Sequence, residues 1–465
     1  MPLAIIAGMH LLFDRGTLLL HEIPHGIDPA AIPGVCWDAR VAMWRAPGRL
    51  AYPLAANLRR RGVAMTNTPC PKLAPPSTFR TVSLRPYQQA ALHAWRLAGR
   101  RGLVALPTGS GKTRVALAAM AATAAPSLCL VPTRALLGQW MKAIAEVYDG
   151  PVGCLGDGER QVHPITVATF ASAYRYMPLI GDRFGLLVVD EAHHFGNTRH
   201  DDALDMAIAP LRLGLSATPP AAGPAATKLA LLVGPTVFEL HVGDLTGNVL
   251  APLDRVTLRL WLQADEQKEL DNLTAIYRHA FHLFTLTHPK ARWEDFVHLA
   301  GHTDEGRRGV AAWRRTRRLL AYPRCKQRAL AGLLAQTRER RTLVFVADNE
   351  TAYRVAREHL IMPLTCDIGR AERDDVLARF ASGQLRALVS AAVLNEGLDV
   401  PDADVGIVIA GRLGEREHTQ RVGRLLRPGV GKRAVVYEMV VQRSSEVRQA
   451  EKRWSRFAAT SRPAV

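Results

Sequence analysis

Short aliphatic runs alternate with amphipathic stretches along most of this chain, from about residue 80 onward. A first series covers residues 102–106, 127–131, 165–169, 184–189 and 211–215, and a second covers residues 342–346, 387–390, 405–410 and 434–439. Because these runs lack polar alternation, they are typical of strands that helices cover on both faces, as in a parallel sheet. The pattern therefore predicts two α/β domains in tandem.

A Pro-rich stretch from Thr68 to Ser77 cannot hold regular structure, and we expect it to close a small N-terminal mixed α+β domain. The predicted domains are 1–78, 79–250 and 251–465. The apolar run from Leu3 to Phe13 ends in Asp14-Arg15-Gly16, which is typical of a strand that meets a turn. A signal peptide is the alternative, but no basic residue precedes the run and His10 interrupts it.

Composition narrows the class of protein. Hydrophobic residues make up 48% of the 465, which excludes a largely disordered chain. Lys and Arg number 60 against 42 Asp and Glu, so the net charge of +18 favours a polyanionic partner. The six cysteines are scattered without metal spacing, and no run approaches the ~18 apolar residues of a membrane span. We expect a reduced cytoplasmic protein with no membrane segment and no structural zinc.

Positive charge concentrates between the two predicted α/β domains. Residues 291–341 hold thirteen Lys or Arg and five Asp or Glu. Arg314, Arg317 and Arg318 fall on one side of a helix, whereas Val310 and Trp313 are expected to point elsewhere. A solvated surface helix and a nucleic-acid contact both fit this pattern.

A glycine-rich loop follows the first predicted strand of the second domain. Its residues are Thr108, Gly109, Ser110, Gly111, Lys112 and Thr113, and a helix-prone stretch comes next. Small residues let backbone N–H groups approach a polyphosphate, Lys112 reaches the outer phosphates, and Thr113 can ligate Mg²⁺. Leu106 stands where the common pattern has glycine. An ordinary glycine-rich turn would explain the glycines but not Gly-Lys-Thr between a strand and a helix.

Two carboxylates follow the predicted strand at residues 184–189. In Asp190-Glu191-Ala192-His193, Asp190 suits a metal ion and Glu191 suits the water that attacks the γ-phosphate. His193 and His194 raise the alternative of a zinc site, but no third ligand stands at metal spacing.

The remaining motifs resemble those of superfamily-2 helicases and nucleic-acid translocases, which implies two RecA-like domains that bind ATP. The resemblance implies that Arg85 and Gln88 contact adenine, and that Thr133, Arg134 and Thr169 hold the nucleic-acid backbone. It also implies that His193, Ser216 and Thr218 couple hydrolysis to strand movement. Residues 395–401 resemble motif V, with Gly397 and Asp399 at the nucleotide, and residues 420–427 resemble motif VI.

The spacing in motif VI has its own physical rationale. A helix presents Arg424 and Arg427 on one side, so both can aim at a phosphate in a facing domain. An arginine that stabilises the transferring phosphoryl group raises the rate by ~10³ to 10⁵ in comparable enzymes. The resemblance assigns Gln420 to positioning the water. A solvated basic helix is the alternative.

A closer resemblance is to the XPB family, particularly its short archaeal-type members. Residues 13–17, 37–40 and 44–46 are similar to that family's DNA-damage-recognition domain, and residues 265–322 resemble its helical thumb insertion. Family members carry an Arg-Glu-Asp element after the Ser-Ala-Thr motif, whereas this chain continues from Thr218 with Pro219 to Pro224 and no charge. This departure concerns strand separation and leaves the ATPase untouched.

The resemblance implies an ATP- and Mg²⁺-dependent DNA helicase of 3′-to-5′ polarity that acts on single strands and duplex junctions in repair. The alternatives are a duplex translocase that does not separate strands, a nucleotide-switched recognition module for damaged DNA, and an RNA helicase. By resemblance, a nuclease is the expected partner. We expect a monomer in the cytoplasm, associated with the nucleoid.

Overall fold

The computed structural model describes residues 9–220, 222–240, 253–365, 367–391, 403–409 and 434–451. The chain divides into two compact units, with the division between His241 and Val242, and each unit is described by itself. Residues 68–78 between the first two sheets have no helix or strand, as expected of the Pro-rich stretch.

The first unit begins with a small mixed sheet, which has the strand order β3-β4-β2-β1-β5. Its elements are β1 (Met9–Asp14), β2 (Thr17–His21), β3 (Cys36–Asp38), β4 (Met43–Pro47), α1 (Ala51–Arg60) and β5 (Met65–Asn67). Arg15 and Gly16 have positive φ angles of 45° and 89°, and they form the two-residue turn between β1 and β2. The predicted strand and turn at Asp14-Arg15-Gly16 are therefore confirmed.

A second sheet in this unit is parallel apart from its edge strand β9, and its strand order is β13-β6-β12-β11-β7-β10-β8-β9. The strands are β6 (Arg101–Ala105), β7 (Ser127–Val131), β8 (Val152–Gly156), β9 (Glu159–Gln161), β10 (Ile165–Thr169), β11 (Leu186–Val189), β12 (Leu211–Ser216) and β13 (Thr236–Glu239). The five predicted strands of this domain all form, with ends that differ by at most two residues.

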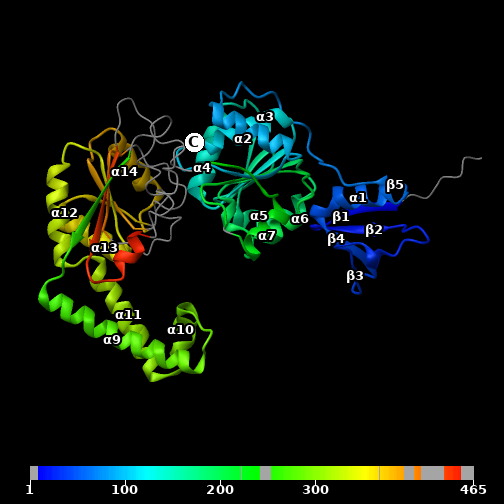
Figure 1. The fold of residues 1–465 in the computed structure, drawn as a ribbon. Coiled ribbons are helices and arrows are strands. Elements are labelled where there is room, and N and C mark those ends of the chain that lie inside the picture. The colour runs from blue at the N-terminus through cyan, green and yellow to red at the C-terminus, as the bar shows by residue number, and fades with distance from the viewer. Residues whose placement is uncertain are drawn as a thin grey trace, which may run out of the picture. The chain divides into compact units, whose positions relative to one another are not determined.

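Helices cover both faces of the second sheet, as the unbroken aliphatic runs require (Figure 1). The helices are α2 (Pro86–Leu97), α3 (Lys112–Thr123), α4 (Arg134–Ala145), α5 (Phe170–Ile180), α6 (Asp201–Met206) and α7 (Pro224–Leu232). One core lies between the sheet and α2, α3 and α4, and it includes Trp95 and Trp140. The other core lies between the opposite face and α5, α6 and α7, around Met177 and Leu204.

The second unit has a fully parallel sheet with the strand order β14-β19-β18-β15-β17-β16. Its strands are β14 (Leu253–Leu260), β15 (Thr342–Phe345), β16 (Met362–Leu364), β17 (Ala387–Ser390), β18 (Val405–Val408) and β19 (Ala434–Val441). The helices α12 (Arg324–Gln336), α13 (Asn349–His359) and α14 (Arg370–Ala381) belong to the same unit. The core between α12, α13 and the sheet includes Leu330 and Val355.

A helical insertion follows β14, as the sequence predicts for residues 265–322. It consists of α9 (Ala264–Thr287), α10 (Trp293–Leu299) and α11 (Asp304–Ala321), and it projects from the sheet of the second unit (Figure 1). Its apolar centre is aromatic: Phe284 packs edge to face on Phe296, and Trp293 packs against Phe296 at a tilt of 48°.

Candidate ATP site and its neighbours

The sheet topology of the first unit gathers the predicted nucleotide residues at one edge. The strands β6, β12, β11, β7 and β10 are parallel neighbours, so their carboxyl ends share that edge. The loop at residues 107–113 follows β6, Asp190 follows β11, and Ser216 ends β12. The crevice at the carboxyl ends of the strands is where open α/β sheets bind ligands.

The glycine-rich loop has the backbone of a phosphate-binding loop. Gly109 and Gly111 adopt φ angles of 82° and 79°, which glycine tolerates best, and α3 begins immediately afterwards at Lys112. A Cβ on Gly111 would lie 2.6 Å from Gln88 Nε2, so a side chain does not fit there. Lys112 Nζ donates to the backbone carbonyl of Leu106 at 3.2 Å. The missing glycine at position 106 matters little to this contact, because any residue supplies the carbonyl.

The side chain of Gln88 is hydrogen-bonded to the backbone of this loop. It is buried, and its Nε2 donates to Ser110 O at 2.8 Å and to Gly111 O at 3.3 Å, while its Oε1 accepts from Arg85 N at 2.9 Å. Both ends of the amide are therefore already bonded to backbone. These bonds show that Gln88 shapes the loop, and its contact with adenine stays a prediction. The hydroxyl of Tyr87 donates to the same Ser110 carbonyl at 2.6 Å.

Asp190 is a buried carboxylate held in a fixed orientation. Trp140 Nε1 donates to its Oδ2 at 2.8 Å, and Glu191 N donates to its Oδ1 at 3.0 Å. Burial raises the pKa of Asp190, whereas the Trp140 hydrogen bond and the positive charge of Lys112 act in the opposite direction. Glu191 has a φ of 48°, and backbone strain of this kind in a non-glycine residue clusters at functional sites.

His193 joins the carboxylate motif to the next strand. Its Nδ1 lies 3.1 Å from Ser216 Oγ and 3.4 Å from Glu191 Oε2. Ser216 Oγ also accepts from Thr218 N at 3.1 Å. The three residues expected to couple hydrolysis to movement are thus brought together.

Two hydroxyl groups at this edge fit a ligand. Thr108 Oγ1 and Thr218 Oγ1 are buried and have no hydrogen-bond partner within the described ranges. Unsatisfied buried hydroxyls are uncommon, and they are consistent with an anionic group between the loop and the strand ends. The donor set of Thr113 and Asp190 is all oxygen, which fits Mg²⁺.

The residues expected at a nucleic-acid backbone are helix caps. Thr133 Oγ1 accepts from Leu136 N at 3.3 Å at the start of α4, and Thr169 Oγ1 accepts from Ser172 N at 3.2 Å at the start of α5. The Arg134 side chain is 76% exposed, with its NH1 at 3.6 Å from Asp157 Oδ1. All three lie at the edge that carries the nucleotide loop.

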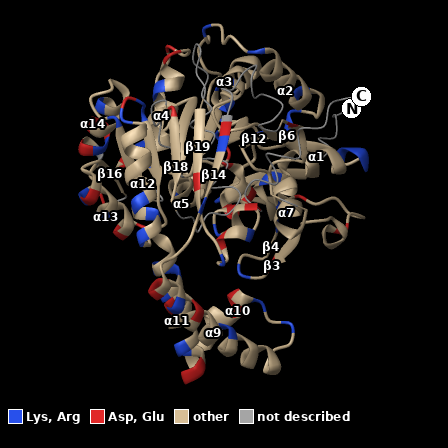
Figure 2. Ribbon diagram, turned by 60° about the vertical axis from the view of Figure 1, so that its left-hand side comes forward, with Lys and Arg blue, Asp and Glu red and all other residues tan. Residues whose placement is uncertain are grey.

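The arginines of α11 differ from the prediction in one respect. The Arg317 guanidinium lies over the ring of Trp313, 4.9 Å from its centroid, so Trp313 does not point away from that side of the helix. Arg314 and Arg318 are exposed and form no ion pair with any carboxylate that the structure describes. Arg315 and Arg307 pair with Glu269 and Asp304, and Figure 2 shows both signs of charge on these helices.

Several predicted site residues lie outside the described residues. They are Gly397, Asp399, Gln420, Arg424 and Arg427. Among the described residues, no group of His, Cys, Asp and Glu side chains is placed to hold a metal ion, so His193 and His194 gain no support as a zinc site. No helix in the same ranges is long and apolar enough to cross a membrane.

Sequence reasoning missed Trp140 and Tyr87 as site residues. Trp140 is 1% exposed and belongs to the core of the first unit, so its pattern is that of an ordinary core residue. Tyr87 stands beside Gln88 in the motif already recognised, and that adjacency was the available signal.

Comparisons with known families agree with this arrangement. The family profile described as Xeroderma pigmentosum group B helicase damage recognition domain matches residues 11–67. The profile for the res subunit of type III restriction enzymes matches residues 81–221, and the helicase conserved C-terminal domain matches residues 325–429.

Whole-chain relatives point the same way. The chain is 33% identical over 375 residues to the DNA 3′-5′ translocase XPB2 of Sulfurisphaera tokodaii, with 80% of this chain and 84% of that protein covered. It is 25% identical to the DNA 3′-5′ helicase XPB of Mycobacterium tuberculosis, with 81% of this chain and 64% of that protein covered.

Solved structures support the fold. The helicase domain of Pyrococcus furiosus Hef matches with a TM-score of 0.50 and 18% identity over 79% of this chain and 97% of that one. S. cerevisiae Dbp5 bound to RNA and ADP BeF3 matches with a TM-score of 0.53 and 16% identity over 80% of this chain and 87% of that one. The prediction of two RecA-like parallel-sheet domains with a small N-terminal mixed domain is confirmed.

Proposed function

Because the chain belongs to the XPB family of DNA 3′-5′ helicases and translocases, we propose that it converts ATP hydrolysis into 3′-to-5′ movement along DNA. The observation that carries this proposal is the His193–Ser216 contact beside the glycine-rich loop. It joins the two motifs that a motor needs to connect, namely the one that handles the γ-phosphate and the one that ends the neighbouring strand.

The nucleotide binds at the carboxyl edge of the first unit's larger sheet. The backbone N–H groups of residues 108–111 and the start of α3 hold the phosphates, and Lys112 leaves the Leu106 carbonyl to meet the outer ones. Gln88 keeps Ser110 and Gly111 in position, and Arg85 contacts the base. The buried hydroxyl of Thr108 gains an acceptor in the bound nucleotide.

Thr113 and Asp190 hold the magnesium ion, which when bound neutralises the charge that develops on the β- and γ-phosphates. The Trp140 hydrogen bond keeps the Asp190 carboxylate aimed at the loop. Glu191 orients the water that attacks the γ-phosphate, and its orientation is fixed by the strained backbone and by His193.

By family resemblance, five residues later in the chain complete the site. Gln420 positions water, Arg424 and Arg427 meet the transferring phosphoryl group, and Gly397 and Asp399 contact the nucleotide. Opening and closing between the units then moves a strand past Thr133, Arg134 and Thr169. Because the hydroxyls of Thr133 and Thr169 are occupied as helix caps, the backbone N–H groups at the starts of α4 and α5 are the proposed donors to DNA phosphates.

Arg314 and Arg318 of α11 add contacts to the DNA backbone. A matched pair of variants tests this, because Arg307 and Arg315 on the same helix are engaged by acidic partners. Replacing Arg314 and Arg318 with Gln lowers the slope of log K against log[salt] on single strands by about 1.4, at ~0.7 per phosphate. Replacing Arg307 and Arg315 with Gln removes equal charge and changes the slope less. Equal slopes for the two double variants would return α11 to a plain solvated surface.

A translocase that does not separate strands is the second candidate. The uncharged stretch from Pro219 to Pro224, where family members carry Arg-Glu-Asp, favours it. Displacement of a third strand from a triplex without displacement of a strand from a tailed duplex would select this candidate. The opposite outcome selects the helicase.

The N-terminal mixed domain is assigned to damaged or distorted DNA, and a nuclease is the expected partner. ATP turnover measured in parallel with no nucleic acid, single-stranded DNA, duplex DNA and RNA tests the proposed function. DNA should raise turnover and RNA should raise it less. Turnover indifferent to all four conditions would reject a nucleic-acid motor.

A further inference from the structure

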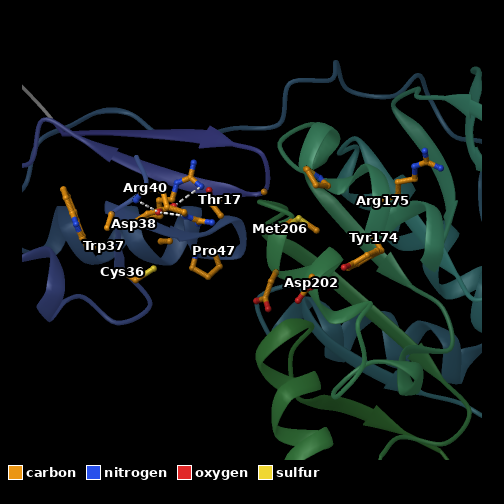
Figure 3. A pocket seen from close by; sticks show the side chains of 16 residues that line it. Thr17, Cys36, Trp37, Asp38, Arg40, Pro47, Tyr174, Arg175, Asp202 and Met206 are labelled. Atoms are coloured by element: carbon orange, nitrogen blue, oxygen red, sulfur yellow. Dashed lines mark hydrogen bonds and ion pairs between the residues drawn. The ribbon is translucent and has the colours of Figure 1, made fainter. Parts of the chain in front are cut away.

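A cavity of about 960 Å³ lies within the first unit, between the N-terminal sheet and the helices α5 and α6 (Figure 3). One wall comes from β3, β4 and the β1–β2 turn and includes Trp37, Arg40 and Arg45. The other wall includes Tyr174, Arg175 and Asp202. No residue of the proposed ATP site lines this cavity.

The two walls are packed against each other, so the cavity is part of the folded unit. Arg49 pairs with Asp205 of α6, and Ile208 lies in the hydrophobic core of the N-terminal sheet. Gly48 lies so close to the carbonyl of Met206 that a Cβ could not be accommodated. Ligand-binding cavities of this size and position occur preferentially between domains.

Exposed aromatic rings stand on both walls. Trp37 is 51% exposed, although its ring is held edge-on by Trp44 at a centroid distance of 5.4 Å across the β3–β4 pair. Tyr174 is 40% exposed and is held by His200 at 6.1 Å. Large rings that are braced at the edge and open to solvent provide ready stacking surfaces.

The polar groups of the lining offer both kinds of hydrogen-bond partner. Arg45 pairs with Asp14 and Asp38 through its terminal nitrogens, whereas its buried Nε has no acceptor among the residues that the structure describes. Asp202 is an exposed carboxylate on the opposite wall. Carboxylates argue against a phosphate or another anion inside the cavity, and the orphan donor argues against a purely apolar ligand.

Cations surround the opening. The side chain of Arg40 is 86% exposed, although its guanidinium donates to both carboxylate oxygens of Asp38 at 2.9 Å, and Arg175 is exposed on the other wall. Residues 9–67 carry seven arginines against four acidic residues. The surroundings therefore suit a ligand that carries its negative charge outside the cavity.

We propose that this cavity binds one unstacked nucleobase of a DNA strand. Trp37 and Tyr174 supply stacking surface, and Arg40 and Arg175 contact the flanking phosphates. Arg45 donates to an acceptor on the base edge, and Asp202 accepts from a donor on that edge. A nucleobase combines a π face with mixed donors and acceptors, and its phosphates remain outside. The cost of extruding a base is a few kcal/mol and is least for one that is already unpaired. The inference rests on the proposed function, since it requires DNA as the ligand.

Binding to two DNA duplexes tests this proposal. Each duplex has one bulged nucleotide, which carries a normal base in the first duplex and has no base in the second. The full-length wild-type chain should bind the first at least fivefold more tightly at equal salt. Trp37→Ala and Tyr174→Ala should each remove most of this ratio, since stacking on one aromatic ring contributes ~1–3 kcal/mol per base. Trp261→Ala is the matched control, because Trp261 is 61% exposed and lies on the second unit. It should keep the wild-type ratio.

Equal binding of the two duplexes by the wild type would overturn the cavity proposal while leaving the motor intact. Retention of the ratio in both aromatic variants would overturn it as well. A wild type that binds neither duplex and whose ATPase ignores DNA would reject the proposed function itself.

Discussion

His193 Nδ1 lies 3.1 Å from Ser216 Oγ, so the carboxylate motif after β11 is hydrogen-bonded to the end of β12. The same serine oxygen accepts from the backbone N–H of Thr218. If a change at the γ-phosphate moves Glu191 and His193, these hydrogen bonds transmit the movement to the segment that follows β12. We propose this contact as the physical basis for coupling hydrolysis to movement.

Replacing Ser216 with Ala should separate the two activities. Without the hydroxyl, His193 and Thr218 N lose their shared partner, while Lys112, Asp190 and Glu191 remain in place. We expect DNA-stimulated ATP turnover to fall less than threefold. The distance moved per ATP should fall about fivefold to tenfold, because coupling between two sites typically changes an equilibrium by at least this factor. Single-molecule translocation measured beside phosphate release checks this. Thr227→Ala, at an exposed hydroxyl on α7, is the control, and equal loss of both activities in Ser216→Ala would contradict the assignment.

Gln88→Ala should weaken nucleotide binding without stopping chemistry. It removes two hydrogen bonds to the carbonyls of Ser110 and Gly111 and leaves a void beneath the loop. We expect the KM for ATP to rise about tenfold, as for the loss of one or two net hydrogen bonds, with kcat changed less. The neighbouring Gln89 donates to Leu84 O on the exposed surface, so Gln89→Ala is a matched control. Similar KM values for the two variants would reject a loop-supporting role.

Arg212 lies in β12, the strand that ends at Ser216, and its side chain is fully buried. Its guanidinium donates to the carbonyls of Leu204, Ala207, Ala209 and Leu232. Burial lowers its pKa to about 9, with a further contribution from Arg101, so the group remains charged at neutral pH.

Arg212→Leu should therefore be strongly destabilising. It leaves four buried carbonyls without donors, and we expect a loss of about 3–5 kcal/mol in the free energy of unfolding. Denaturation in urea measures it. Arg96→Leu, on the exposed face of α2, should change stability by less than about 0.5 kcal/mol. A midpoint for Arg212→Leu close to that of Arg96→Leu would refute the anchoring role.

His359 should make the stability of the second unit depend on pH. Burial lowers the pKa of His359 below 6.5, although Glu358 acts in the opposite direction, and its Nε2 is hydrogen-bonded to the Tyr322 hydroxyl at 2.9 Å. Between the lowered pKa and 6.5 the unfolded chain binds more protons, so stability rises with pH through that window. The contribution of neutral His359 to the free energy of unfolding is complete above pH 6.5, and it is lost as the pH falls from 6.5 to the lowered pKa. His359→Gln should reduce the change in unfolding midpoint between pH 5 and pH 7.5, and an unchanged pH profile would contradict this.

The nucleotide site could be predicted from sequence because its parts are local. The glycines at 109 and 111, Lys112 and the carboxylates after β11 each follow a strand within a few residues, and parallel strands bring their ends to one edge. The orientation of Gln88 could not be predicted, because it depends on how α2 packs beneath the loop. The Trp140–Asp190 hydrogen bond spans fifty positions of sequence and left no local pattern.

The strand β14 shows a different limit. From Arg255 to Leu260 its residues alternate between polar and apolar positions, whereas β15, β17, β18 and β19 of this sheet are predicted from unbroken aliphatic runs. The strand lies at the edge of its sheet and pairs with β19 alone, so one face can remain polar. The cavity beside Trp37 was beyond sequence reasoning altogether, since it depends on how α6 packs against the N-terminal sheet.

We propose that ATP hydrolysis at the carboxyl edge of the first unit's larger sheet, assisted by Arg427, drives movement on DNA. The most direct test is ATP turnover of the full chain with saturating single-stranded DNA, for the wild type, Lys112→Ala and Arg427→Ala. ATP turnover should fall at least ~100-fold in both variants. Lys112→Ala loses a contact to the phosphates, and Arg427→Ala loses the charge that stabilises the transferring phosphoryl group. Near-normal DNA-stimulated turnover in Arg427→Ala, with Lys112→Ala inactive, would show that the second unit takes no part in the chemistry.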